Sequence, residues 1–185
     1  MNTSNYSNNF GKQWSIFRKT QLDSYSKIPV SENRFFHATN WKKNEIKNKL
    51  ILDVGCGAGR FAEIALQAGA NLIAIDYSGA VKSAYQNLHL HPNFSVIQAD
   101  IYKLPFKSEQ FDFVYCLGVL QHTPNVEKAF NCLPIMVKPG GKLCVDYYWK
   151  RFLTMMHSKY VFRPFTKNMS HEKLLKVIKI LLPSL

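Results

Sequence analysis

The stretch Leu50-Ile51-Leu52-Asp53-Val54-Gly55-Cys56-Gly57-Ala58-Gly59 joins an apolar run to an acidic residue and then to three glycines at alternate positions. The apolar run has the length and composition of a buried β-strand. Because glycine lacks a Cβ, such a loop can turn sharply into a helix and lets a bound molecule approach the backbone closely. The stretch therefore predicts a strand, a ligand-binding loop and a helix.

Two later apolar runs also end in an acidic residue, Asp76 and Asp100. The carboxyl ends of parallel strands meet at one edge of a sheet, and open α/β sheets bind their ligands there. Together with Asp53, these positions predict one nucleoside-like ligand lying across that edge.

Composition limits the classes of protein to which the chain can belong. A chain of 185 residues with 46% hydrophobic residues can bury one good core. The four cysteines form no CxxC pair, which favours thiols in a reducing compartment over a disulfide framework or a metal site. The start of the chain is polar, and Lys179 interrupts the late apolar run. We therefore expect neither a secretory signal nor a membrane span, and a cytoplasmic location.

The net charge of +12 is concentrated at the two ends of the chain. Residues 1–49 carry 9 basic and 3 acidic groups, residues 50–149 carry 7 and 8, and residues 150–185 carry 8 and 1. Two explanations stay open: the lysines decorate solvated helices, or they form a functional basic surface.

Between residues 50 and 148, β-rich runs alternate with helical patterns, which predicts βαβ units and a mostly parallel sheet. The later strands are expected at 72–75, 94–98, 111–116 and 142–148, the last one delivered by a turn at 139–141. Helices are expected to follow Gly59, Ser78 and Thr123, with an irregular connection over 102–110. Helical spacing predicts that Tyr85, Val126 and Phe130 face inward.

The two ends predict different structures. Residues 1–49 hold aromatic anchors in a polar background, which predicts a helical cover segment over the core at 50–149. Residues 150–185 form a basic tail, in which Ser170 is expected to cap an amphipathic helix. Two interpretations of this helix stay open: docking on the core, and peripheral contact with a membrane surface.

The spacing of the glycines differs from the nicotinamide-binding pattern, because Arg60 stands where a third glycine would be expected. The Asp53-x-Gly55-x-Gly57-x-Gly59 loop, the acids at 76 and 100, Phe111-Asp112 and Lys138-Pro139-Gly140-Gly141 follow in order. With these motifs the chain resembles the class I S-adenosylmethionine-dependent methyltransferases, most closely their type 11 branch, over roughly residues 49–148. The resemblance implies a Rossmann-like, doubly wound, mostly parallel sheet of about five strands flanked by helices.

The resemblance also implies a set of ligand contacts. Asp76 would accept hydrogen bonds from the ribose hydroxyls, and Asp100 with the Ile101 amide would bind the adenine edge. Asp53, as an ionised carboxylate, would hold the glycine loop in place. Tyr77 could lie on the adenine face. The full set of expected cofactor contacts is Asp53, Gly55, Cys56, Gly57, Gly59, Asp76, Tyr77, Asp100, Ile101 and Leu117.

Two further residues are candidates for work on the methyl acceptor. His122 follows the fourth strand and has an ordinary pKa of about 6.5, which suits a general base; the alternative is a structural histidine near a helix cap. Arg34 could pair with the carboxylate of the cofactor or with an anionic substrate, and the alternative is a surface arginine.

One feature departs from the family pattern. Members usually add two strands that form a hairpin beside strand five, and nothing after Tyr148 resembles such a pair. A bare fifth strand would favour aggregation or pairing. We therefore expect the C-terminal segment or a partner chain, as in a homodimer, to cover it.

Three functions stay open at this point. The leading one is methyl transfer to a small molecule such as a sugar, lipid or quinone precursor. The second is RNA or protein methylation, which the basic ends favour; however, Cys116-Leu117-Gly118-Val119 lacks the Asn/Asp-Pro-Pro-aromatic signature, so nucleic acid is not the expected partner. The third is a truncated, non-catalytic module that binds S-adenosylmethionine.

Overall fold

The computed structural model describes residues 11, 13–147, 166 and 169–181. The chain divides into two compact units at the boundary between residues 148 and 149. Within the described part of the chain, no helix is long and apolar enough to cross a membrane.

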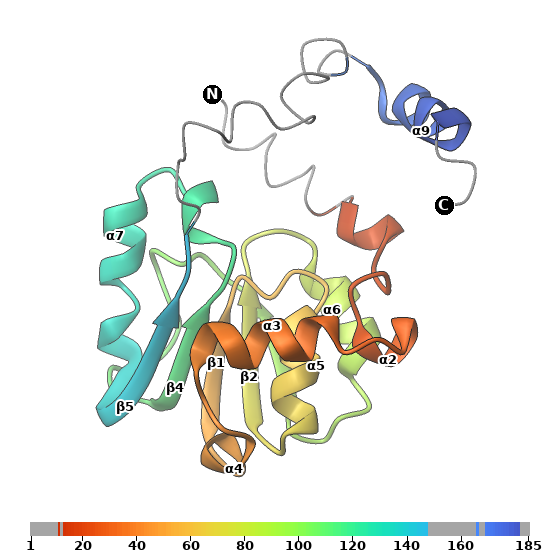
Figure 1. The fold of residues 1–185 in the computed structure, drawn as a ribbon. Helices are drawn as coiled ribbons and strands as arrows, with labels where there is room; N and C mark the ends of the chain where they lie inside the picture. Colours follow the sequence, from red (N-terminus) through yellow and green to blue (C-terminus); the bar gives the residue numbers. More distant parts are fainter. Residues whose placement is uncertain (1–10, 12, 148–165, 167–168, 182–185) are drawn as a thin grey trace. The chain divides into compact units, whose positions relative to one another are not determined.

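The first unit is built on a parallel sheet of five strands in the order β3-β2-β1-β4-β5 (Figure 1). The strands are β1 (Leu50–Val54), β2 (Asn71–Asp76), β3 (Phe94–Gln98), β4 (Phe111–Cys116) and β5 (Val137–Val145). The order reverses direction at β1, which pairs with both β2 and β4. The glycine loop leaves β1 at this switch point, where open α/β sheets bind ligands. The expected doubly wound fold is confirmed.

Helices cover both faces of the sheet. On one face lie α3 (Val30–Thr39), α5 (Arg60–Gln67) and α6 (Val81–Leu88); α3 and α5 run in front of the strands in Figure 1. Their core includes Phe35, Phe61 and Tyr115, all buried. The other face packs Leu52 and Val114 against α7 (Val126–Asn131) and the segment after β3. The predicted helix after Gly59 is present as α5; it ends at Gln67, and Gly69 just beyond it takes φ +86°.

Carboxylates attach the N-terminal segment to this core. Buried Glu63 of α5 accepts the amide of Asp23 (2.9 Å), which begins the short helix α2 (Asp23–Ser26). Asp23 in turn accepts the amides of Ser31 (2.9 Å) and Glu32 (2.8 Å) at the start of α3. These bonds satisfy amides that the first turn of a helix leaves unpaired. A further short helix, α4 (Lys43–Ile46), leads into β1 and buries Ile46.

Two boundaries predicted from the sequence are wrong. The expected turn at 139–141 lies inside β5, which begins at Val137. Phe111 pairs with Val137 and Phe113 with Lys142, so β5 carries extra residues as a bulge, where Gly140 takes φ +77°. The third predicted helix starts later than expected, at Val126, and the 3-10 turn η1 (Leu120–His122) precedes it. The Asn125 side chain, which accepts the Lys128 amide (2.8 Å), caps α7 in place of Thr123.

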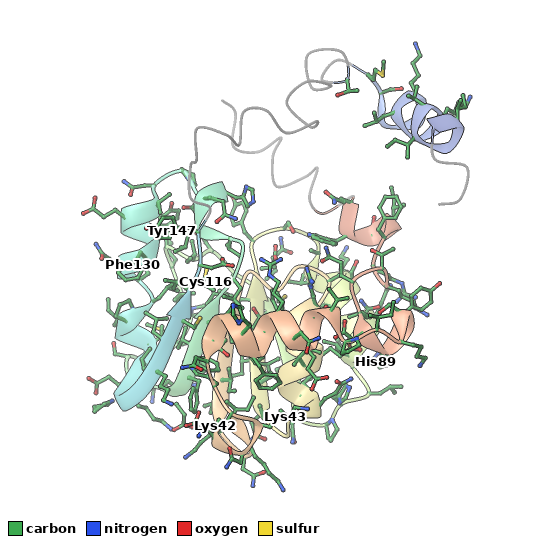
Figure 2. The ribbon with its side chains drawn as sticks, viewed as in Figure 1. Lys42, Lys43, His89, Cys116, Phe130 and Tyr147 are labelled. Carbon is green, nitrogen blue, oxygen red and sulfur yellow. The ribbon has the colours of Figure 1, made fainter. Side chains whose placement is uncertain are left out.

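Three inward assignments are also wrong. Tyr85 is 58% exposed, Val126 is 44% exposed and Phe130, labelled on α7 in Figure 2, is 38% exposed. Both helices bury their small residues, Ala84 and Ala129, instead. The short helices therefore present a narrower apolar stripe than the periodicity suggested.

In the second unit, the structure describes the helix α9 (His171–Leu181). Ser170 caps it, since its Oγ accepts the amide of Lys173 (3.3 Å), as the sequence predicted. The tail expected to cover β5 begins at residue 150, and residues 148–165 lie outside the described part.

Candidate functional site

The glycine loop is fastened to the end of β2. The amides of Gly55 and Cys56 both donate to the Ile75 carbonyl (2.7 and 2.9 Å), and the amide of Gly57 donates to Asp76 Oδ2 (2.9 Å). All three N–H groups are therefore bonded within the protein. These residues offer a ligand a close backbone surface rather than free donors.

Asp76 is the centre of this arrangement. Its Oδ1 accepts the amide (2.8 Å) and the hydroxyl (2.7 Å) of Ser78, while Oδ2 holds Gly57. A carboxylate can accept about four hydrogen bonds. Asp76 therefore has capacity left for a ligand while it fixes both loops that surround it.

Asp100 lies beside Asp76 because β2 and β3 are parallel neighbours that end together. Asp76 pairs with Gln98, and the amide of Ala99 donates to the Asp76 carbonyl (3.1 Å). Asp100 Oδ1 accepts the Tyr102 amide (2.9 Å). The side chain of Ile101 is buried in the core, which leaves its backbone as the part of the residue that could bind a ligand. The structure thus brings together the two acids that the sequence placed at one edge.

Asp53 is buried below the loop, in register with Tyr115 on β4. Burial raises its pKa to about 8; the neighbouring Tyr115 hydroxyl acts in the opposite direction and Asp76 adds to the rise. The expectation of an ionised Asp53 is therefore wrong for the structure in this form, because the residue is removed from water. Its Oδ2 and the Tyr115 hydroxyl are both buried without a completed hydrogen bond. Burial also raises the pKa of Cys56 well above its usual range, so this loop cysteine stays a thiol.

The N-terminal segment lies across the loop. Trp14, in the helical turn at residues 13–16, sits next to Gly57: a Cβ there would come within 3.3 Å of Trp14 Nε1. A Cβ on Gly11 would lie 3.5 Å from the Gly79 nitrogen, in the turn after β2. Asn87 of α6 ties the two parts together, since its Nδ2 donates to the carbonyls of Ala58 (2.8 Å) and Arg18 (3.0 Å).

A second loop follows β4, whose last residue, Cys116, is labelled in Figure 2. The amide of Gly118 donates to Asp146 Oδ1, and Asp146 Oδ2 lies 3.5 Å from Arg34 Nη2. Arg34 also lies over the ring of Phe61, 5.5 Å from its centre. Arg34 thus pairs with a protein carboxylate in the structure. Leu117 is buried in the core, so its side chain does not face the loop.

Gln121 and His122 form the turn η1 beyond this loop. His122 is exposed, and partial desolvation lowers its pKa, which keeps more of the imidazole neutral at pH 7. Both polar atoms of the Gln121 side chain are buried without a hydrogen-bond partner. Val119 packs directly on the glycine loop, because a Cβ on Gly55 would lie 2.3 Å from Val119 Cγ2.

The structure therefore gathers most of the predicted residues around one edge of the sheet. Tyr77 is beside Asp76 but 61% exposed, and its ring makes no ring contact among the described residues. Sequence patterns missed the roles of Asn87 and Asp146, since each acts through a contact that only the folded chain creates. Among the described residues, no group of His, Cys, Asp and Glu side chains could hold a metal ion.

These features suit a nucleoside that carries a positive charge. Two carboxylates stand where hydroxyl and amine donors could reach them. The loop glycines pack too closely for side chains, since a Cβ on Gly55, Gly57 or Gly59 would meet Val119, Trp14 or Leu88. Asp53, at the end of β1, adds a buried carboxylate oxygen without a partner. S-adenosylmethionine, with the donors of its ribose and adenine and its positive sulfonium, matches this set of acceptors.

Comparison with known proteins gives the same assignment. Residues 52–145 match the family model described as a methyltransferase domain. A ubiquinone biosynthesis O-methyltransferase of Coxiella burnetii is 30% identical over 125 residues, covering 63% of this chain and 53% of that protein. A sterol 24-C-methyltransferase of Kluyveromyces lactis is 32% identical over 149 residues, covering 78% and 39%. The chain spans about half the length, or less, of these curated relatives.

Solved structures share the fold. A putative S-adenosyl-L-methionine-dependent methyltransferase from Methanococcus maripaludis superposes with a TM-score of 0.61 at 19% identity, covering 92% of this chain and 81% of that one. The YcgJ protein of Bacillus subtilis gives a TM-score of 0.54 at 24% identity, covering 64% and 50%. At these identities the likeness concerns the fold alone.

Proposed function

The chain belongs to the methyltransferase-domain family of class I S-adenosylmethionine-dependent methyltransferases, and from this premise we propose that it methylates a small-molecule acceptor. The observation that carries the proposal is the junction of Asp76 with the glycine loop at 2.9 Å, beside Asp100 at the switch point of the sheet. That arrangement provides a nucleoside site bounded by a second loop after β4.

We assign the cosubstrate contacts as follows. Asp76 accepts the ribose hydroxyls with its remaining capacity, and Asp100 with the Ile101 backbone binds the adenine edge. Asp53 lies below the charged end of the ligand. The proposed contact residues are those of the sequence prediction: Asp53, Gly55, Cys56, Gly57, Gly59, Asp76, Tyr77, Asp100, Ile101 and Leu117.

When bound, S-adenosylmethionine supplies a methyl group attached to a positively charged sulfur. The sulfur is the leaving group and keeps the electrons of the broken carbon–sulfur bond. The chain therefore has to align the acceptor, exclude water and accept a proton. Trp14 and Gly11 are placed to exclude water from the glycine loop. His122 is the proton acceptor in this proposal, because its lowered pKa favours the neutral imidazole.

The names of the relatives favour an apolar or ring-containing acceptor, since one acts in ubiquinone biosynthesis and another on a sterol. For this chain we propose a lipid or a quinone precursor ahead of a sugar. We further propose a cytoplasmic location and a homodimer in which a second copy covers β5. Size measurement in solution tests the dimer: a strictly monomeric protein contradicts it.

The basic tail supports a peripheral membrane contact. In α9, Lys173 and Lys176 are exposed, while Leu174 and Ile178 lie on another face of the helix and are half-buried. A helix with separate basic and apolar faces suits an anionic lipid surface. Co-sedimentation with phosphatidylglycerol vesicles tests it: K173E/K176E should lose binding, whereas a K82E/K107E control, changed at two exposed lysines of the first unit, should keep it.

Methyl transfer itself is tested with purified full chain and S-adenosylmethionine labelled in its methyl group. The protein is incubated with a protein-free extract of small metabolites, and the label in the extract is followed. Transfer that requires the wild-type chain and is reduced at least tenfold in H122A, while S-adenosylhomocysteine binding is kept, supports the proposal. Binding of the nucleoside without any transfer favours the non-catalytic alternative.

A further inference from the structure

The side chain of Gln121 is buried in a way that stability alone does not explain. Its Nε2 and Oε1 are both removed from water, and neither has a hydrogen-bond partner. The remaining buried side-chain atoms without a partner among the described residues are Asp53 Oδ2 and the Tyr115 hydroxyl, below the glycine loop. A buried polar group that is left unpaired is unfavourable for folding. An apolar side chain of the same length would therefore be more favourable here for folding.

The backbone around Gln121 is held firmly. The amide of His122 donates to the Val119 carbonyl (2.8 Å), and both the amide and the hydroxyl of Thr123 donate to the Leu120 carbonyl (3.0 and 2.7 Å). Upstream, Gly118 is held by Asp146. The turn therefore holds the unpaired amide in a fixed position, and such preorganisation reduces the cost of ordering a bound ligand.

The turn also lies next to the proposed cosubstrate. Val119 packs against Gly55 of the glycine loop, and the space above Gly118 is open, with no atom within 4 Å of a Cβ added there. Gln121 comes two residues after Val119 and directly before His122. Gln121 and His122 therefore belong to the same short turn, which follows the loop that packs on Gly55.

We propose that Gln121 binds the methyl acceptor and selects it by hydrogen bonding, an inference that rests on the proposed methyltransferase function. An amide presents one donor and one acceptor side by side. Its complement is a pair of oxygens on neighbouring atoms, at least one of which carries a hydrogen. The acceptor class is therefore a vicinal diol, or a hydroxyl next to a carbonyl, and not an isolated hydroxyl or amine. A site built to bond such a pair rejects analogues that lack it, because its buried groups would stay unpaired.

The test compares Q121M, which keeps the length of the side chain, with Q67M, the same change at an exposed position at the end of α5. Three quantities are measured on the full chain: the affinity for S-adenosylhomocysteine, the midpoint of thermal unfolding, and label transfer into a dilution series of protein-free metabolite extract. For Q121M we expect unchanged affinity within twofold and an equal or higher midpoint. The amount of extract that half-saturates the reaction should rise at least tenfold, with a smaller change in maximal rate.

Several results would overturn the inference. A midpoint lowered by several degrees in Q121M would make the amide structural, and a tenfold loss of S-adenosylhomocysteine affinity would assign it to the cosubstrate. If the amount of extract that half-saturates the reaction is unchanged in Q121M, Gln121 does not bind the acceptor. If Q121M does not fold, Q121E provides the comparison: it replaces the donor by an acceptor, and unchanged saturation there would likewise remove Gln121 from the acceptor site. A wild-type chain that binds no nucleoside contradicts the proposed function itself and is recognised separately.

Discussion

The indole of Trp14 lies against Gly57, so closely that a Cβ on Gly57 would come within 3.3 Å of Trp14 Nε1. Gly57 also has φ +54°, a conformation that residues with side chains rarely adopt. The N-terminal segment and the glycine loop are therefore packed as one unit around the site.

G57A should weaken binding of S-adenosylhomocysteine at least tenfold, because the added methyl group strains the loop and displaces Trp14. G79A is the matched control, since no atom lies within 4 Å of a Cβ at that position and its φ is not positive. Calorimetric titration measures both. Equal binding by the two alanine variants would mean that close packing at residue 57 does not shape the site.

Trp14 should report ligand binding by fluorescence. The chain has three tryptophans, Trp14, Trp41 and Trp149, and Trp41 is buried in the core. We expect titration with S-adenosylhomocysteine to change the emission of the wild type and of W149F, and the change to disappear in W14F. A signal that persists in W14F would place the ligand away from the N-terminal segment.

Asp53 should make stability fall as the pH rises. Burial raises its pKa to about 8 in the folded chain, whereas an unfolded chain titrates near 3.9. Between these values the folded form binds the extra proton, so the contribution is complete below about pH 4 and is lost as the pH passes about 8. The midpoint of thermal unfolding should therefore fall more steeply from pH 6 to 9 in the wild type than in D53N. At pH 9, D53N should be the more stable protein. Parallel curves would contradict the raised pKa.

Asp112 should stabilise the opposite end of the sheet. Its Oδ2 accepts the Leu50 amide and its Oδ1 accepts Lys138 Nζ, both at 2.9 Å. Desolvation acts to raise its pKa, but the bonds to Lys138 and Leu50 outweigh it and the pKa is lowered. The contribution is therefore present above the unfolded pKa and is lost as the pH falls through the lower folded value.

We expect D112N to reduce the free energy of unfolding by about 1–2 kcal/mol at pH 7, with the difference shrinking toward pH 3. Denaturant unfolding measures it, with the exposed Glu127 changed to Gln as control. An equal loss at both pH values would show that the charge of Asp112 is irrelevant.

Much of the fold could be predicted because its signals are local. The strands Phe94–Gln98 and Phe111–Cys116 were predicted with their observed bounds, since each is a short β-rich run between clear breakers. The prediction at Gly140 was wrong. A glycine pair after a proline indicates a turn, whereas the pairing of β5 with β4 accommodates these residues as a bulge within the strand. The predictions at Tyr85 and Phe130 were wrong for a similar reason: periodicity does not tell how wide the buried stripe of a short helix is.

The site residues also differ in whether local sequence signals predict them. Asp76 and Asp100 could be predicted, because the ends of parallel strands converge in any such sheet. The protonation of Asp53 could not, since it depends on burial against Tyr115. The pairing of Arg34 with Asp146 joins residues 112 positions apart, and no local pattern predicts it.

Whether the nucleoside binds at Asp76 is decided by calorimetric titration of the full chain with S-adenosylhomocysteine, for wild type and D76N in parallel. We expect one binding site per chain in the wild type and an affinity at least tenfold weaker in D76N, while a D100N chain shows an intermediate loss. Absence of binding by a folded wild-type chain, or equal affinity in D76N, would contradict the assignment of this edge of the sheet as the cosubstrate site.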